Sequence, residues 1–357
     1  MSAWTDKFSQ RPMASMALFA GLCLLPLLAQ QLGQAPVRVL DQALLYVLLA
    51  LGLNIVVGYA GLLDLGYVAF YAVGAYLFAL LASPHLTEQF AGLRAHFPLG
   101  LHAPWWLILP LAAGLAALAG LLLGAPTLRL RGDYLAVVTL AFGEIIRLFI
   151  NNLGHPVNVT NGARGISPID DLQFFGLPLG RPLDLGFVTM APVTLYAYLL
   201  LALVGLSVLI SARLGRSRLG RAWMALREDE VAARAMGLDT RGLKLRAFAV
   251  GATFGGVAGV FFAALQGFIS PESFSLQESV LIVAMVVLGG MGHVPGVILG
   301  AMLLSVLPEA LRYASGPLQR LTDGHLDAPI LRQLLIALAM IGIMLWRPRG
   351  LWVARRS

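Results

Sequence analysis

Charged side chains are scarce in this sequence. Of its 357 residues, 25 are Lys or Arg and 18 are Asp or Glu, so only 12% are charged, which is about half the share usual in soluble domains. Hydrophobic residues make up 59%, and the mean hydropathy is +0.81. This composition excludes a water-soluble globule and predicts an integral membrane protein.

Cysteine and lysine are almost absent, and each shortage excludes a kind of site. Cys23 is the single cysteine, so the chain forms no intrachain disulfide and no thiolate-cluster metal site. The two lysines, Lys7 and Lys244, follow Asp6 and Leu243, so no phosphate-binding loop of the Gly-Lys-Ser/Thr type exists. The six histidines lack the spacing of a helical metal pair. We therefore expect no metal, no cofactor and no ATP hydrolysis by that route in this chain.

Apolar runs approach the length of a bilayer span at ten places. The first follows two basic residues and resembles a signal peptide, but the many later runs favour a membrane helix. The pattern predicts an all-α, polytopic protein with about ten transmembrane helices, in which residues 1–357 form a single membrane domain. The runs are Met13–Ala29, Val39–Val57, Leu65–Ala82, Trp105–Gly124, Tyr134–Ile150, Val193–Ile210, Ala247–Leu265, Ser279–Leu288 (the short one), Val297–Leu311 and Ile330–Trp346.

Basic residues cluster in the connections between these runs and give a net charge of +7. With the N-terminus inside, the inner side carries 17 of them and the outer side 6, while Arg147 and Arg332 fall within runs. This is the positive-inside pattern, and no segment interleaves basic residues with stacking aromatics as a nucleic-acid-binding face does. We expect both termini and loop 211–246 to be cytoplasmic, loop 151–192 to lie outside, and no nucleic-acid partner.

Glycines at helical spacing predict close helix packing. Gly251, Gly255 and Gly259 recur every four residues on one predicted helix, and Gly66 and Gly74 lie eight apart on another. Small residues let helix backbones approach within lipid, where little hydrophobic force brings helices together. We interpret all five as packing positions in preference to a substrate passage.

Asp64 lies between the second and third runs, bracketed by Gly58, Gly61 and Gly66. An interrupted helix here would present free backbone groups to a cavity, so Asp64 is a candidate lining residue of a permeation path. The alternative is that Asp64 caps the third membrane helix near the inner interface, because Asp is a favoured N-cap.

Glu144 is a carboxylate within an apolar run. It lies roughly 15 Å from the inner end of that run, near mid-bilayer, and Arg147 follows one turn later on the same face. Two interpretations stand side by side. The pair is either a static, mutually neutralised one or a substrate or proton site, because ionisable groups within a membrane are functional candidates.

Loop 211–246 contains a predicted amphipathic helix. Good helix formers run from Arg221 to Met236, and Gly237 follows where a left-handed C-cap is expected. Such a helix either lies on the anionic membrane surface or docks its small-residue face into a groove of a cytoplasmic partner. One face carries Ala225, Ala232 and Met236, and the opposite face carries Arg227, Glu230 and Arg234.

The glycine-rich stretch Gly289–Gly296 only superficially resembles a dinucleotide-binding turn. Pro295 stands where that pattern requires glycine, and no strand precedes the stretch. We predict a tight turn between two membrane spans.

Four stretches together resemble one known family. The likeness is to the LivM-type permease subunit of bacterial branched-chain amino-acid ABC importers, and it extends from about Val39 to Trp352. The family commonly has Ser at the position of Asp64 and often His at that of Tyr67, so it assigns neither residue a role here. The stretches are 61–76 (GLLDLGYVAFYAVGAY), 130–147 (LRGDYLAVVTLAFGEIIR), 220–237 (GRAWMALREDEVAARAMG) and 285–292 (MVVLGGMG).

The resemblance implies a permease of the bacterial inner (cytoplasmic) membrane. This permease passes leucine, isoleucine and valine inward by alternating access and forms half of the translocation pathway. Its implied partners are a second permease of the LivH type, two cytoplasmic ATPase subunits that hold ATP and magnesium, and a periplasmic amino-acid-binding protein. The chain itself would then be no enzyme, and residues 151–192 would be a periplasmic loop.

The resemblance also implies that loop 211–246 holds the coupling helix that contacts an ATPase. Three other functions stay open: a permease for urea or another small amide or amino acid, a proton-coupled secondary transporter using Glu144 or Asp64, and a scaffold that only recruits a partner. The candidate ATPase-coupling residues are Ala225, Glu228, Ala232, Ala233, Met236 and Gly237, and the candidate translocation-path residues are Asp64, Tyr67, Glu144 and Arg147.

Overall fold

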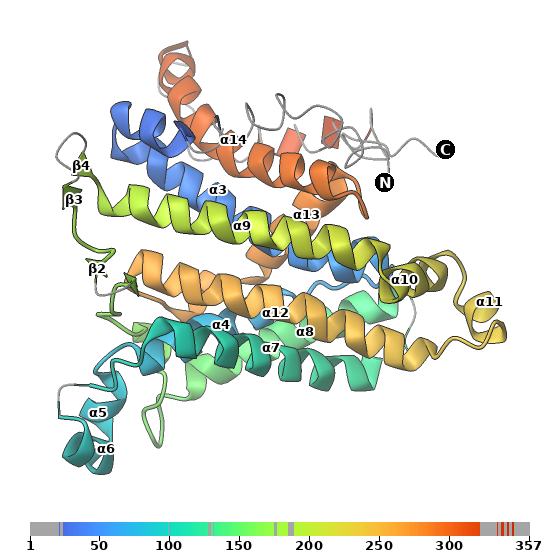
Figure 1. Ribbon diagram of the computed structural model, residues 1–357, viewed down its shortest axis with the longest axis horizontal. Coiled ribbons are helices and arrows are strands. Elements are labelled where there is room, and N and C mark those ends of the chain that lie inside the picture. Colours follow the sequence, from blue (N-terminus) through green and yellow to red (C-terminus); the bar gives the residue numbers. More distant parts are fainter. Residues whose placement is uncertain are drawn as a thin grey trace. The chain divides into compact units, whose positions relative to one another are not determined.

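A computed structural model describes residues 21, 24–98, 100–127, 130, 132–174, 177–184, 189–321, 334, 337, 338, 341, 342 and 345. The chain is a helical polytopic protein (Figure 1). It divides into two compact units. The first unit comprises Met1–Val47, Arg181–Gly205 and Met285–Ser357, and the second comprises Leu48–Gly180 and Leu206–Ala284.

Eight of the ten predicted runs coincide with helices, which confirms the hydropathy reading there. Of the other two, Met13–Ala29 lies partly and Ile330–Trp346 mostly outside the described residues. In the described part, four helices are long and apolar enough to cross a membrane: Gln34–Tyr59, Trp105–Thr127, Pro192–Arg216 and Thr240–Gln266. The matching helices are α3 (Gln34–Leu53), α4 (Val68–Leu81), α7 (Trp105–Thr127), α8 (Asp133–Asn152), α9 (Pro192–Arg216), α12 (Thr240–Gln266), α13 (Leu276–Gly289) and α14 (Val294–Leu321).

Helix α12 packs closely against α4 and α7 in the second unit. A Cβ atom on Gly74 of α4 would overlap the carbonyl group of Gly256, and one on Gly259 would overlap the carbonyl oxygen of Tyr71. Gly251 faces Val56, and a Cβ atom on Gly255 would lie 3.0 Å from the Cβ of Phe70. The glycines therefore let the backbone of α12 lie directly against its neighbours.

The chain between α3 and α4 leaves the α-helical form. Helix α3 continues as a fully buried π-helical segment, η1 (Asn54–Tyr59), and residues 60–67 follow without α-helix. Gly61 has φ +71°, a left-handed conformation that glycine adopts without strain. The predicted interruption around Gly58, Gly61 and Gly66 is confirmed.

Connections predicted to share a side of the membrane contact one another within the second unit. On the predicted outer side, Ile166 N–H bonds the Ile269 carbonyl at 2.9 Å, and Asp170 N–H bonds the Ala82 carbonyl at 2.8 Å. At the opposite end, the Tyr59 hydroxyl donates to the Ser211 carbonyl at 3.2 Å. The elements of the outer connections are α5 (His85–Gln89), α6 (Ala91–His96), η2 (Gly162–Arg164), β1 (Gln173–Phe174), antiparallel β2 (Leu177–Pro178) and η3 (Pro271–Phe274).

In the first unit, the predicted tight turn joins α13 to α14. Gly290 and Gly292 have φ of +106° and +83°, which confirms the turn. The Gly296 N–H donates to Nδ1 of His293 at 3.2 Å, and burial lowers the pKa of His293, which favours the neutral ring that this bond needs. This unit also contains the antiparallel strands β3 (Leu183–Asp184) and β4 (Thr189–Met190).

The packing of α12 predicts contrasting effects for two glycine substitutions. Gly74→Ala should destabilise the protein by about 1–3 kcal/mol, because the new methyl group has no room beside Gly256. Gly114→Ala on α7, where a Cβ atom meets nothing within 4 Å, should be neutral or up to about 1 kcal/mol stabilising. Melting temperatures of both variants in mild detergent check this, and equal effects would contradict the packing.

Candidate docking surface

The connection between α9 and α12 consists of two short helices with capped ends. They are α10 (Arg218–Glu228) and α11 (Glu230–Ala235). The Ser217 hydroxyl accepts the Gly220 N–H at 3.1 Å, and Asp239 accepts the Gly242 N–H at 3.1 Å at the start of α12. Asp229 accepts the N–H groups of the second and third residues of α11 at 2.7 and 3.0 Å. The prediction of one continuous helix from Arg221 to Met236 is therefore wrong, because Asp229, in extended conformation, ends one helix and caps the next.

The C-terminus of α11 ends as predicted. Gly237 has φ +84° and donates to the Arg234 carbonyl at 3.0 Å, while Leu238 N–H reaches the Ala233 carbonyl at 3.1 Å. These two bonds form a Schellman motif, which satisfies carbonyl groups that the helix end would otherwise leave without partners.

Apolar side chains of α10 and α11 point into solvent. Val231 is 63% exposed and Met236 is 84% exposed. Ala233, predicted among the coupling residues, is instead buried within the chain and is not available to a partner. Glu228 and Gly237 are exposed. We call the exposed apolar set the docking surface: Met224, Ala225, Val231, Ala232 and Met236.

Helix α10 is anchored to the ends of membrane helices. The indole N–H of Trp223, a fully buried side chain, donates to the Leu243 carbonyl of α12 at 2.8 Å. Arg227 donates from Nη1 to the Gly58 carbonyl of η1 at 2.5 Å, and its side chain lies over Gly61, where a Cβ atom would be 2.7 Å from it. The part of the docking surface on α10, Met224 and Ala225, is therefore fixed to both α12 and the interruption after α3.

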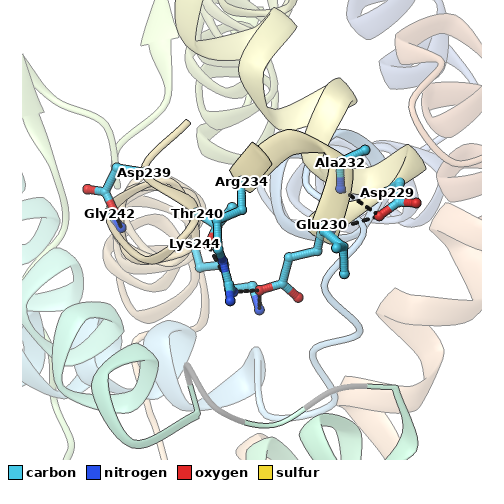
Figure 2. Close-up of polar contacts among 9 residues, drawn as sticks. Asp229, Glu230, Ala232, Arg234, Asp239, Thr240, Gly242 and Lys244 are labelled. Carbon is cyan, nitrogen blue, oxygen red and sulfur yellow. Dashed lines mark hydrogen bonds and ion pairs between the residues drawn. The ribbon is translucent and has the colours of Figure 1, made fainter. Parts of the chain in front are cut away.

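Helix α11 contacts α12 through ionic groups, which Figure 2 shows. Glu230 Oε1 lies 3.0 Å from Lys244 Nζ and 3.1 Å from Nη2 of Arg234, and the same Nη2 donates to the Thr240 hydroxyl at 3.4 Å. Of the predicted charged face, Glu230 is half-buried against α12, whereas Arg227 and Arg234 remain exposed while bonding to their own chain.

Asp64 and Tyr67 lie at the interruption between η1 and α4, and both are buried. Asp64 Oδ1 accepts the Gly66 N–H at 2.9 Å, and within the described residues Oδ2 has no hydrogen-bond partner. Tyr67 donates its hydroxyl to the Gly251 carbonyl of α12 at 3.0 Å. The capping alternative for Asp64 is wrong, because Tyr67 occupies the N-cap position of α4 and no side chain caps that helix.

Glu144 and Arg147 form an ion pair on α8. Arg147 Nε donates to Oε1 and Oε2 of Glu144 at 3.1 and 3.0 Å, and Nη2 also contacts Oε1. Both side chains are half-buried. Within the described residues, no hydrogen bond or ion pair joins this pair to Asp64 or Tyr67. The Glu144–Arg147 ion pair is therefore separate from the interruption that holds Asp64 and Tyr67.

Gly66, the fifth predicted packing glycine, brings the interruption against α8. A Cβ atom on Gly66 would overlap the Thr139 carbonyl, and the Leu65 N–H donates to the Thr139 hydroxyl at 3.0 Å. On the other side, the Ser279 hydroxyl donates to the Leu65 carbonyl at 2.6 Å.

Sequence reasoning missed Asp41, a carboxylate inside α3. It is fully buried, and neither of its oxygens has a hydrogen-bond partner in the described part of the chain. Its position within the apolar run Val39–Val57 could have identified it from the sequence, because a carboxylate is unusual there.

No group of three or more possible metal-ligating His, Cys, Asp or Glu side chains occurs among the described residues.

These features define a multi-pass helical membrane protein with a capped two-helix connection at one end. A family model described as "Branched-chain amino acid transport system / permease component" matches residues 35–344. The chain belongs to this family, which is a family of transporter permeases and not of enzymes.

Named relatives agree with this membership. The high-affinity branched-chain amino acid transport system permease protein LivM of Escherichia coli strain K12 is 44% identical over 332 residues, covering 89% of this chain and 70% of the relative. The probable LivM of Methanocaldococcus jannaschii is 29% identical, covering 86% and 90%. The permease protein LivH of Escherichia coli strain K12 is 25% identical over 276 residues, covering 75% and 82%. No solved structure matches the chain.

The cap at Asp229 leads to a local test. Asp229→Ala should weaken α11 by about 1 kcal/mol and raise amide hydrogen exchange in residues 230–235 about five-fold, because two N–H groups lose their acceptor. Asp229→Asn keeps an acceptor oxygen and should exchange nearly as the parent does. Mass spectrometry of the exchanged peptides gives the result. Unchanged exchange in Asp229→Ala would mean that the cap does not hold the helix.

Proposed function

We propose that this chain is the LivM-type permease subunit of an ATP-driven importer of leucine, isoleucine and valine in the bacterial inner membrane. It forms half of the translocation pathway and works by alternating access. The whole chain, 1–357, acts as one permease with about ten spans and cytoplasmic termini. Family membership and the 44% identity to a LivM protein support this substrate class, and the distribution of basic residues supports the orientation.

The proposed partners supply what this chain lacks. ATP and magnesium bind two cytoplasmic ATPase subunits, since the sequence has no phosphate-binding loop of the Gly-Lys-Ser/Thr type. A second permease of the LivH type forms the other half of the pathway, and a periplasmic binding protein delivers the amino acid to the side of loop 151–192. The similarity of this chain to LivH proteins supports a pair of related permeases.

The docking surface is the observation that carries the proposal. Val231 projects from the six-residue α11 and Met236 from its C-terminal end, among exposed charged side chains and outside the long apolar spans. Exposed apolar side chains rimmed by polar ones mark protein-binding sites, and an amphipathic helix suits a groove on a partner. We infer that loop 211–246 is cytoplasmic and that an ATPase subunit covers this surface, with Glu228 and Gly237 at its rim.

Two pairs of residues are proposed for the translocation path. Asp64 and Tyr67 lie in the non-helical stretch between η1 and α4, where backbone groups are not all used in helical hydrogen bonds. Glu144 and Arg147 lie within α8 and carry opposite charges, as the two ends of an amino-acid zwitterion do.

A charge on the docking surface should separate this chain from its ATPase. Ala232→Asp would bury an unpaired carboxylate in the interface and weaken binding by about 2 kcal/mol or more. The variant should reach the membrane in normal amount, yet lose the ATPase subunits on affinity purification in mild detergent and lose amino-acid uptake.

The matched control is Ala232→Ser, which adds a hydroxyl group without a charge at the same position. It should retain the ATPase subunits and most of the uptake. Full retention of both by Ala232→Asp would show that the ATPase docks elsewhere.

A further inference from the structure

The base of α12 and the short helix α11 are joined by one buried ion pair. Lys244 lies in the second turn of α12, and its side chain is 6% exposed, while that of its partner Glu230 is 18% exposed. The Nζ–Oε1 distance is 3.0 Å. Figure 2 shows the two side chains extending toward each other from different helices.

This pair resists separation more than a surface pair does. Separating the two side chains would leave charges without their partner in surroundings that exclude most water, which costs free energy. The pair therefore opposes movement of α11 away from α12. Arg234 also contacts Glu230, but its side chain is 59% exposed, and exposed pairs contribute little. Arg234 also donates to the Thr240 hydroxyl of α12 at 3.4 Å, so Lys244 supplies the shorter and more buried of the two links between the helices.

Helix α11 has few other means of holding its position. It has six residues, too few to be stable by themselves, and it ends in the Schellman turn at Gly237. Ala233 is its one fully buried residue. Helix α10 has separate anchors, Trp223 and Arg227. Loss of the ion pair would thus leave α11 with only the long Arg234–Thr240 bond among these polar links to α12, while α10 keeps both of its anchors.

Helix α12 is able to carry a displacement into the membrane core. It is a continuous helix of 27 residues, and beyond Lys244 its glycines lie against the backbones of α4 and α7. Close-packed backbones move together and do not absorb small displacements. A movement of α11 that reaches Lys244 is thereby passed to the helices around the interruption at Asp64.

We propose that Glu230 is a positioning residue that transmits the movement of the docking surface to α12 through Lys244, so that ATP hydrolysis drives transport. The inference rests on the proposed function, because it assumes an ATPase on the docking surface. It assigns the transmission to one ion pair, distinct from the apolar side chains that bind the partner.

The test compares uptake with ATP hydrolysis in the complete transporter reconstituted in proteoliposomes with its binding protein. The variants are Glu230→Gln, the reversed pair Glu230→Lys with Lys244→Glu, and Arg234→Gln as the control that keeps the buried pair. ATPase co-purification and melting temperature are measured for each, and labelled leucine is the transported probe.

Glu230→Gln should keep its ATPase subunits and hydrolyse ATP within about two-fold of the parent, while leucine uptake per ATP falls about ten-fold. The reversed pair should recover most of that ratio, and Arg234→Gln should keep it. Equal losses of uptake and hydrolysis, failure of Glu230→Gln to assemble, an unchanged ratio, or no recovery in the reversed pair would each overturn the proposal. Failure of the proposed function is distinguishable, because the parent complex would then lack ATPase subunits or ATP-dependent uptake.

Discussion

The close approach of α12 to α4 and α7 is the constraint on which the rest of the second unit depends. Gly74 and Gly259 leave room for neighbouring carbonyl groups, so these helices pack backbone against backbone. Dense packing of this kind replaces the hydrophobic force that lipid does not supply between helices. The base of α12 then presents the Leu243 carbonyl and the Lys244 ammonium at fixed positions, and both short helices of the connection attach there.

Two of the many charged groups in this connection bond to their own chain beside the membrane helices. Glu230 meets Lys244, and Arg227 meets a carbonyl at the end of η1, so polar partners satisfy one another beside the membrane helices. The apolar side chains Val231 and Met236 are left facing outward. Exposed apolar side chains among exposed charged ones are the physical basis of the proposed ATPase contact.

Helix positions in this chain were predictable because long apolar runs have few alternatives in a bilayer. The glycine-rich turn and the Gly237 cap were also predictable, since left-handed backbone favours glycine. The break at Asp229 was not predicted, because the residues on both sides are good helix formers and an aspartate within such a stretch does not by itself indicate a cap. Treating 221–236 as one helix counted Ala233 among the coupling residues, although the structure buries it. Partners far along the sequence, such as Lys244 for Glu230, cannot be read from the spacing within one segment.

The central claim is that this chain is one part of an importer whose transport is driven by ATP on partner subunits and not by an ion gradient through this chain alone. Its most direct test is uptake of labelled leucine into proteoliposomes that hold this chain, its second permease, the ATPase subunits and the binding protein. Uptake should require ATP on the ATPase side, stop with vanadate and continue with a protonophore. Uptake by this chain alone, driven by a proton gradient and abolished by the protonophore, would contradict the account and assign Glu144 or Asp64 a proton-carrying role.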